Sequence, residues 1–294
     1  MITPYRVDHS AFDSHAFLIE SENKRIFYSG DFRGHGRKSE AYKWFLGHAP
    51  QNIDYLLMEG SQIGKKNDKI ITEEDIQKEL TSIFSKETGP KFVFTSSQNI
   101  DRLVSVFKAC IKTNHILVLD IYSANVLHTL SQFANLPDPL NGFININVMF
   151  PYRTTKMLFD RNKKSYAKKF KPFYINKKII SKNPDKYVIL VRPSMQKDID
   201  KIQNFSEGVL IYSLWSGYKS KPNIMKFLDY MQSRNIKIID CHTSGHAYLS
   251  TLQEFTDALQ PKHIIPIHTF HKQQYKNLFN YPVLELDDKE LLKF

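Results

Sequence analysis

Residues 236–247, IKIIDCHTSGHA, decide the fold of this chain because they join an apolar strand to a loop with two histidines. The sequence predicts a strand over 236–240 and a helix over 249–259, on the two sides of this loop. A glycine between two histidines suits a turn whose backbone amides face an anion, and neighbouring hydroxyls add donors to a phosphate. The candidate phosphate-binding residues of the loop are His242, Thr243, Ser244 and Gly245.

Three other short motifs lie near the two ends of the chain and carry metal-ligating side chains. They contain His9 in residues 7–10 (VDHS), Asp31 in residues 29–32 (SGDF) and His268 in residues 266–268 (PIH). Each adjoins a predicted strand, where a rigid sheet edge can aim side chains into a shared cleft. A carboxylate such as Asp31 can bridge two divalent cations about 3.5–4 Å apart. Taken singly, each residue also fits a structural role: a turn cap for Asp31 and hydrogen-bonded histidines for the other two.

Between these motifs the pattern alternates between strands and helices. A hairpin is predicted over residues 16–31 and a strand over 53–59, and Thr72 is the predicted N-cap of a helix over 70–90. Further strands are predicted over 91–95, 115–120, 187–192, 208–213 and 263–267, and further helices over 99–113 and 222–233. The alternation predicts an α/β fold with a parallel sheet covered by helices.

Composition excludes several classes of protein. Apolar residues make up 41% and charged residues 24% of the 294 residues, which is typical of a globular chain. The sequence has no apolar run long enough for a membrane-spanning helix and no N-terminal signal pattern, so no membrane partner is expected. Two cysteines, Cys110 and Cys241, fit a reducing cytoplasm. The net charge of +11 favours an anionic partner such as nucleic acid, although a lysine-rich composition alone would also produce it.

The order of the motifs carries a family resemblance. DHSAFDS (8–14), SGDFR (29–33), LLMEGS (56–61), CHTSGHA (241–247) and PIH (266–268) follow one another as in the β-CASP branch of the metallo-β-lactamase superfamily. The chain resembles ribonuclease J and the endonuclease that cleaves the 3′ end of mRNA. The resemblance implies an αββα metallo-β-lactamase core with an inserted α/β cap. Residues 1–61 would begin the core, 62–232 would form the cap, and 233–294 would return to the core with an RNA-specificity segment.

The resemblance also assigns roles to residues. It implies two zinc ions, with His9 and His268 as ligands and Asp31 as the bridging carboxylate. Glu59 and His246 would form a relay in which the carboxylate orients the imidazole and favours its protonated form. The implied activity is zinc-dependent hydrolysis of phosphodiester bonds in nucleic acid, with RNA or single-stranded nucleic acid as the partner. A homodimer is compatible with the resemblance.

One family motif has no counterpart here. The upstream cluster His-x-His-x-Asp-His, which supplies most remaining zinc ligands in the family, does not occur in this sequence. A complete dinuclear site would need those residues, and we expect a shortened form of the enzyme whose missing strands would leave a sheet edge unpaired. Two other functions stay open: a nucleic-acid-binding protein with a degenerate site, and a metallo-β-lactamase-fold hydrolase of a small phosphoester or ester.

The predicted cap contains a strongly basic stretch. Residues 161–186 hold ten Lys and Arg against one acidic residue, with four aromatic residues among them. Such a mixture can pair with phosphates while its rings stack on unpaired bases; a solvated helix with buried aromatics is the alternative. The candidate substrate-binding lysines are Lys163, Lys164, Lys168 and Lys169. Ser216, in an aromatic stretch at 212–218, is a weaker candidate for a phosphate contact.

Overall fold

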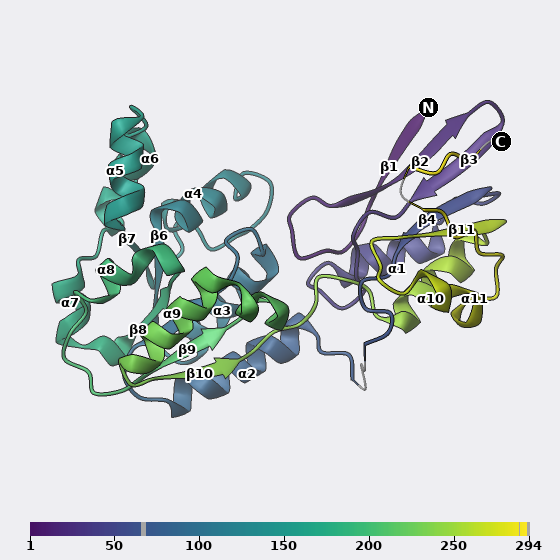
Figure 1. Cartoon of the computed structure of the whole chain (residues 1–294). Helices are drawn as coiled ribbons and strands as arrows, with labels where there is room; N and C mark the ends of the chain where they lie inside the picture. The colour runs from purple at the N-terminus through teal and green to yellow at the C-terminus, as the bar shows by residue number, and fades with distance from the viewer. Residues whose placement is uncertain (66–68, 288, 293–294) are drawn as a thin grey trace. The chain divides into compact units, whose positions relative to one another are not determined.

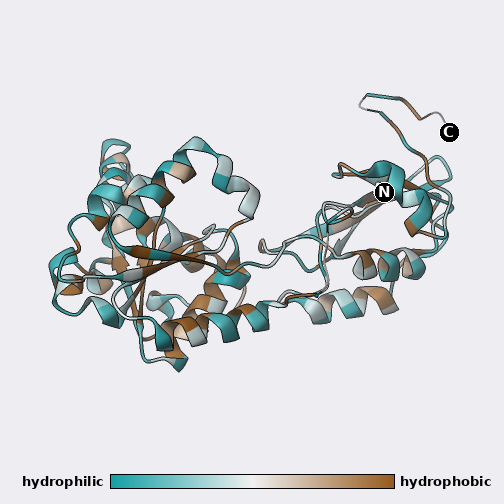
Figure 2. Ribbon diagram, turned by 60° about the horizontal axis from the view of Figure 1, so that its bottom comes forward, coloured by the Kyte–Doolittle hydropathy of each residue, from teal (hydrophilic) through white to brown (hydrophobic). Residues whose placement is uncertain are grey.

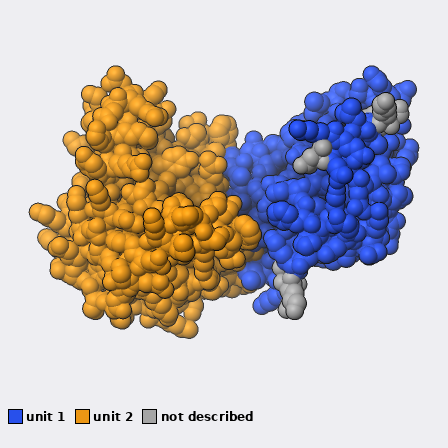
Figure 3. Space-filling model, viewed as in Figure 1, with its two compact units in different colours: residues 1–72, 244–294 blue, residues 73–243 orange. Residues whose placement is uncertain are grey.

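The computed structural model describes residues 1–65, 69–287 and 289–292 and divides into two compact units. Unit 1 combines Met1–Thr72 with Ser244–Phe294, and unit 2 is the continuous segment Glu73–Thr243 (Figure 3). These boundaries lie further along the chain than the 61/62 and 232/233 positions expected from the sequence. The predicted α/β class is confirmed. No helix in the described part of the chain is long and apolar enough to span a membrane.

Unit 1 contains a five-stranded sheet in the order β1-β2-β3-β4-β11. Its strands are β1 (Ile2–Arg6), β2 (His15–Ser21), β3 (Lys24–Tyr28), β4 (Tyr55–Glu59) and β11 (His263–Ile267). The first three strands pair antiparallel, whereas β3, β4 and β11 pair parallel (Figure 1). It follows that β1, β3, β4 and β11 all run in one direction and end at the same edge of the sheet.

The β2–β3 hairpin forms where the sequence predicts it. Its turn residues Glu22 and Asn23 have φ angles of 50° and 62°. Two successive left-handed residues make the type of turn whose twist matches that of the flanking strands. The hairpin therefore fixes the register in which Phe17 pairs with Tyr28.

The core of unit 1 lies between this sheet and the helices α1 (Ser39–Gly47), α10 (Leu249–Leu259) and α11 (Tyr275–Leu278). Phe27 and Leu56 of the sheet are fully buried in the same cluster as Phe45 of α1 and Phe255 of α10. The last two rings lie 4.9 Å apart between centroids. Each such buried side chain contributes about 1.5–3 kcal/mol relative to an exposed one, so this layer anchors both ends of the chain.

Unit 2 contains a six-stranded sheet in the order β10-β9-β5-β8-β6-β7, and every pair in it is parallel. Its strands are β5 (Lys91–Phe94), β6 (Ile116–Asp120), β7 (Ile146–Met149), β8 (Tyr187–Leu190), β9 (Gly208–Tyr212) and β10 (Ile236–Asp240). Hydrophobic residues concentrate on these strands (Figure 2). Strands β5, β8 and β9 are buried along their whole length, as expected of a parallel sheet covered on both faces.

The helices that follow β8 and β9 pack in a different cluster from those that follow β5 and β6. The cluster that contains Phe94 and Leu210 of the sheet includes Ile199 and Phe227, from α8 (Gln196–Ile199) and α9 (Pro222–Ser233), but no residue of α3 (Ile100–Lys112) or α4 (Ile121–Leu130). The remaining helices are α2 (Glu73–Lys86), α5 (Tyr152–Asp160), α6 (Ser165–Lys168) and α7 (Lys177–Lys182). Among these, α2 packs against α3, whereas α5 has no buried residue.

Candidate metal centre

The candidate site of unit 1 lies at the edge where four strands end. Asp31 follows β3, Glu59 is the last residue of β4, and His268 follows β11. His9 follows β1, which runs in the same direction. Because the carboxyl ends of all four strands share one edge, residues separated by more than 250 positions in the sequence reach the same place.

Three side chains form a cluster that can hold a metal ion. The ligand atoms of Asp31, His246 and His268 all lie within 4.8 Å of one another. His268 Nδ1 lies 2.8 Å from Asp31 Oδ1, and the rings of His246 and His268 are 5.0 Å apart. Two imidazoles and a carboxylate are a donor set that zinc accepts, and three protein ligands leave a position open for substrate or water. The residues present therefore fit one divalent cation of this kind.

His268 has a strained backbone. Its φ angle is +48°, a left-handed conformation that side chains other than glycine rarely adopt. The hydroxyl of Ser61 donates a hydrogen bond of 3.2 Å to the His268 carbonyl, which helps to hold this conformation. Strained residues of this type cluster at functional sites, where the surrounding structure holds them in place. In this conformation the imidazole lies against Asp31.

Glu59 is fully buried and holds the loop that contains His246. Its carboxylate accepts hydrogen bonds from the backbone amides of Ser61, at 3.1 Å, and Ala247, at 3.2 Å. It also lies 3.2 Å from Nδ1 of His246. Burial of the imidazole lowers the pKa of His246, but the hydrogen bond and the charge of Glu59 outweigh this effect and raise the pKa above its usual value. Glu59 thus orients the imidazole and favours its protonated form.

His9 approaches the cluster from β1. Its Nδ1 donates a hydrogen bond of 2.7 Å to the Gly245 carbonyl, and no residue in the described part of the chain hydrogen-bonds its Nε2. Its ring lies 5.9 Å from that of His246. Burial, partly offset by the Gly245 carbonyl, lowers the pKa of His9 and keeps the imidazole neutral. A neutral imidazole is the form that binds a metal.

The loop at 244–247 packs tightly against these residues. The hydroxyl of Ser244 accepts hydrogen bonds from the His246 amide, at 3.1 Å, and from Gln62, at 2.5 Å. A Cβ atom added to Gly245 would lie 3.0 Å from the Ser10 hydroxyl and 3.2 Å from the His9 ring. Only glycine fits this approach without displacing its neighbours. His242 and Thr243 precede this loop as the last residues of unit 2, and Thr243 is buried.

A buried ion pair joins the loop that contains His9 to the loop that contains Asp31, and it was not predicted from the sequence. Asp8 and Arg33 are both fully buried, with Oδ1 3.7 Å from Nε. Asp8 also accepts a 2.6 Å hydrogen bond from the Gly36 amide, and Arg33 donates one of 2.9 Å to the Ser244 carbonyl. Each charged residue is next to, or two residues from, a predicted metal ligand. This closeness in the sequence could have indicated that Asp8 and Arg33 hold the metal ligands in position.

The predicted substrate-binding residues of unit 2 differ in exposure. Lys163, Lys164 and Lys168 are exposed, whereas Lys169 packs over the rings of Tyr166 and Phe170 at 5.6 and 5.3 Å. Phe170 is fully buried and cannot stack on a base, but Tyr166 and Tyr174 are almost half exposed. Ser216 begins a short 3-10 turn at 216–220 that follows β9.

The net positive charge of the chain lies entirely in unit 2. Unit 1 contains 15 Lys and Arg and 15 Asp and Glu, so the net charge of +11 belongs to residues 73–243. A basic domain attached to a neutral one is the distribution expected when the domain binds a polyanion.

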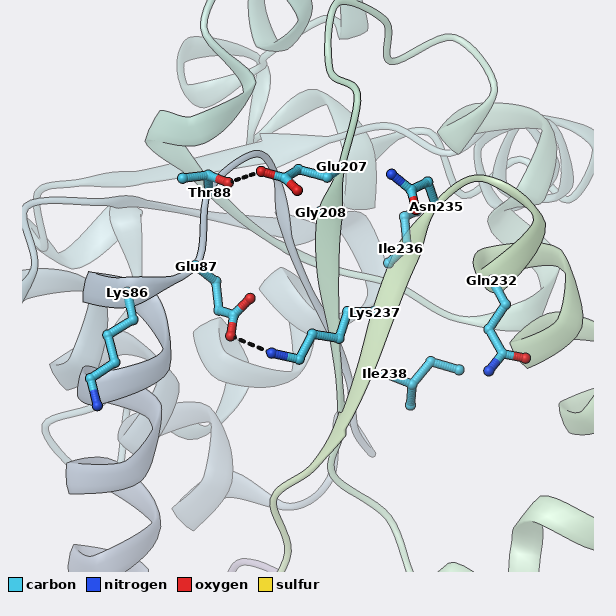
Figure 4. A pocket seen from close by; sticks show the side chains of 10 residues that line it. All are labelled: Lys86, Glu87, Thr88, Glu207, Gly208, Gln232, Asn235, Ile236, Lys237 and Ile238. Carbon is cyan, nitrogen blue, oxygen red and sulfur yellow. Dashed lines mark hydrogen bonds and ion pairs between the residues drawn. The ribbon is translucent and has the colours of Figure 1, made fainter.

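Unit 2 also has a hollow of about 540 Å³ at the edge of its sheet where strands β9 and β10 begin (Figure 4). Gly208 and Ile236, at the amino ends of β9 and β10, contribute to its wall. Among the groups that line it, Glu87 pairs with Lys237 at 2.8 Å and Thr88 donates a hydrogen bond to Glu207.

Comparisons with known proteins agree with the motif order. A family model described as the RNA specificity domain of Zn-dependent metallo-hydrolases matches residues 221–279, a segment that includes His246 and His268. Ribonuclease J 2 of Streptococcus pyogenes serotype M3 is 22% identical over 287 residues, which cover 91% of this chain and 46% of that protein. The chain thus spans about half the length of this relative.

A solved structure shows the same fold. The crystal structure of a protein of unknown function from Enterococcus faecalis V583 superposes with a TM-score of 0.73 at 20% identity. The match covers 98% of this chain and 62% of that one. Together, these findings identify the chain as a relative of the β-CASP metallo-β-lactamase proteins, as the motif order predicts.

Proposed function

We propose that this chain is a zinc-dependent hydrolase of phosphodiester bonds in RNA. The observation that carries the proposal is the cluster of Asp31, His246 and His268, with Glu59 buried behind His246. Support also comes from the segment match to an RNA specificity domain and from the basic charge of unit 2. We assign unit 1 to the metallo-β-lactamase core and unit 2 to the β-CASP cap.

Asp31 and His268 would hold the metal, with the free Nε2 of His9 as a further donor. A zinc ion bound there would supply Lewis-acid stabilisation of charge on the scissile phosphate. Strain at His268 and the buried Asp8–Arg33 pair keep these donors in position before the metal arrives. The second zinc ion implied by the resemblance would need ligands beyond this cluster.

His246 lies within reach of the same metal position, but Glu59 favours its protonated form. In this scheme His246 is therefore not a metal ligand and would hold the proton that the leaving oxygen takes up. Its Nδ1 faces Glu59, so the opposite ring nitrogen is the one available to the substrate. Glu59 is a positioning residue in this scheme, because it touches the imidazole and three backbone amides rather than the substrate. Removal of the carboxylate would release both the ring and the 244–247 loop.

The test replaces His246 with alanine and compares it with His48→Ala. His48 is an exposed histidine of unit 1 that hydrogen-bonds the Trp44 carbonyl, outside the cluster. We expect His246→Ala to abolish cleavage of single-stranded RNA in the presence of zinc, while His48→Ala retains it and both variants keep the wild-type circular dichroism. Unchanged turnover by His246→Ala would refute the mechanism.

The metal is tested separately by elemental analysis of the purified protein. Zinc that is present in the wild type and absent from Asp31→Asn supports the cluster as the binding site. A metal-free protein that still retains RNA, with a steep salt dependence, would instead indicate a degenerate nucleic-acid binder. Hydrolysis of small esters that survives replacement of Lys163, Lys164 and Lys168 by glutamine would indicate the small-substrate alternative.

A further inference from the structure

Unit 2 has a topological switch point at the carboxyl edge of its sheet. From β5 the chain crosses β8 to reach β6, whereas from β8 it crosses β5 to reach β9. The neighbouring strands β5 and β8 therefore send their following loops in opposite directions, one toward α3 and the other toward α8. In open parallel sheets, ligands bind in the crevice that such diverging loops leave at the carboxyl ends of the strands.

Arg192 lies at this switch point and is fixed by its neighbours. It follows β8, and its Nη2 donates to Asp120 Oδ2 at 2.6 Å and to the Ser97 hydroxyl at 2.7 Å. A third, longer contact of 3.3 Å reaches the hydroxyl of Ser123. All three partners are buried: Ser97 lies in the loop after β5, Asp120 is the last residue of β6, and Ser123 lies in the first turn of α4. Two segments of the chain thus hold the Arg192 guanidinium in a defined orientation.

Only part of this guanidinium is occupied. Its side chain is 31% exposed, and the described residues offer no hydrogen-bond partner to its Nε or Nη1. These nitrogens can bind an oxyanion from solvent, and a planar guanidinium suits a phosphate better than an ammonium does. Asp120 meanwhile accepts hydrogen bonds from the Tyr122 and Ser123 amides, so its carboxylate is engaged by four donors and faces the protein.

An aromatic ring completes the arrangement. The guanidinium carbon of Arg192 lies 5.1 Å from the centroid of the Tyr122 ring, and 41% of the Tyr122 side chain is exposed. Gln98 holds the tyrosine hydroxyl at 3.3 Å. A ring fixed at its hydroxyl beside a phosphate-binding cation is a combination that binds single-stranded nucleic acid, with the base stacked on the ring.

We infer that Arg192 and Tyr122 form a nucleotide-binding subsite on unit 2, in which Arg192 binds a backbone phosphate of single-stranded RNA and Tyr122 stacks on an adjacent base. The inference rests on the proposed RNA substrate. It is consistent with the confinement of the positive charge to this unit. Arg192 and Tyr122 would hold the substrate, not carry out its hydrolysis.

The chain offers a matched control for Arg192. Arg234 is also in unit 2, pairs with Asp200 at 2.7 Å, and lies 5.6 Å from the Phe205 ring. Its side chain is 25% exposed, close to the value for Arg192. It precedes β10, however, and so lies at the amino edge of the sheet. Arg192→Gln and Arg234→Gln remove the same charge from similar surroundings at opposite edges.

The experiment measures fluorescence anisotropy of a fluorescein-labelled oligouridylate with the full chain in EDTA, where no metal supports cleavage. We expect Arg192→Gln to weaken binding about tenfold or more, as for loss of a charge-assisted contact, and to reduce the salt slope by about 0.7. Arg234→Gln should change affinity by less than about twofold. Tyr122→Leu should weaken binding at least about fivefold, whereas Tyr122→Phe, which keeps the ring, should not.

Several outcomes would overturn the inference. Equal affinities of the Arg192→Gln and Arg234→Gln variants would assign the effect to general charge. If Arg192→Gln lowers the melting temperature, the Arg192→Lys variant is tested instead. Lysine keeps the positive charge and the pair with Asp120 but lacks the planar guanidinium. Wild-type affinity in the Arg192→Lys variant would refute the subsite. A wild type that does not bind the oligonucleotide refutes both this subsite and the proposed substrate. Normal binding with no zinc-dependent cleavage refutes the nuclease alone.

Discussion

His268→Gly and His268→Ala test whether the candidate metal centre stores backbone strain. Both changes remove the imidazole and its contact with Asp31, a partly exposed pair worth about 0.2–1 kcal/mol. They differ at the backbone, where φ is +48°. This conformation costs alanine about 1–2 kcal/mol and glycine almost nothing. The extra freedom of glycine in the unfolded chain offsets about 0.4–1 kcal/mol of that difference. We expect the glycine variant to be more stable by about 0.5–1 kcal/mol.

Urea unfolding of the metal-free protein measures this difference. The chain has two tryptophans, Trp44 on α1 in unit 1 and Trp215 in unit 2. In a Trp215→Phe background, Trp44 reports the unfolding of unit 1 separately, which matters because two units need not unfold together. The same pair of substitutions at His263, the first residue of β11, serves as the control. There glycine should be less stable than alanine, as expected within a strand.

Zinc affinity gives a second result from the same variants. Both should bind zinc at least about tenfold more weakly than the wild type, because a ligand is lost in each. An alanine variant as stable as the glycine variant would show that the backbone at residue 268 is relaxed. Unchanged zinc affinity in both variants would show that His268 is not a ligand, and the proposed metal site would be wrong.

Arg102→Met should lower the free energy of unfolding of unit 2 by about 3–5 kcal/mol, because it removes the guanidinium that binds both carboxylate oxygens of buried Glu73. Trp215 fluorescence in urea measures the loss, and a change below about 1 kcal/mol would contradict it. Burial, reinforced by Lys91, lowers the pKa of His115 below its usual 6.5, so the unfolded chain binds the proton more readily and stability falls as the pH drops below about 6.5. His115→Gln should remove this part of the pH dependence of unfolding, and an identical profile would disprove the assignment. Burial raises the pKa of the Cys110 and Cys241 thiols, so neither should react with a disulfide reagent until urea unfolds the chain. Rapid labelling of the native protein would contradict the burial.

The sequence predicted the elements whose apolar pattern is strong. Strands β10 and β11 and helix α10 have the predicted bounds, and the hairpin and strands β5, β6, β8 and β9 lie within a few residues of theirs. Strand β7 of the unit 2 sheet was not predicted. Strand β1 was missed because it is short, contains Pro4, and alternates between exposed and half-buried residues. Helix α5 was also not predicted, and none of its residues is buried.

The site was predictable where strand direction determined it. Residues that follow parallel strands must meet at one sheet edge, and this consequence covers Asp31, Glu59 and His268. The motif order led us to expect His246 in the same pocket as Asp31 and His268, but it gave no sign that His246 would lie in reach of a metal as well as of Glu59. It also gave no sign of the Arg192 subsite, because the partners of Arg192 come from the loop after β5 and from the junction of β6 and α4 and share no motif.

Strand order has a consequence for synthesis. The inner strands of the unit 1 sheet are made early, but β4 pairs with β11, whose first residue is 208 positions later than its partner Tyr55. A nascent chain on the ribosome therefore completes the self-contained unit 2 while its first sheet still lacks a strand. His246 and His268 are both translated after unit 2. A ribosome that stops between residues 243 and 263 would release a complete, basic unit 2 attached to a unit 1 sheet that lacks β11.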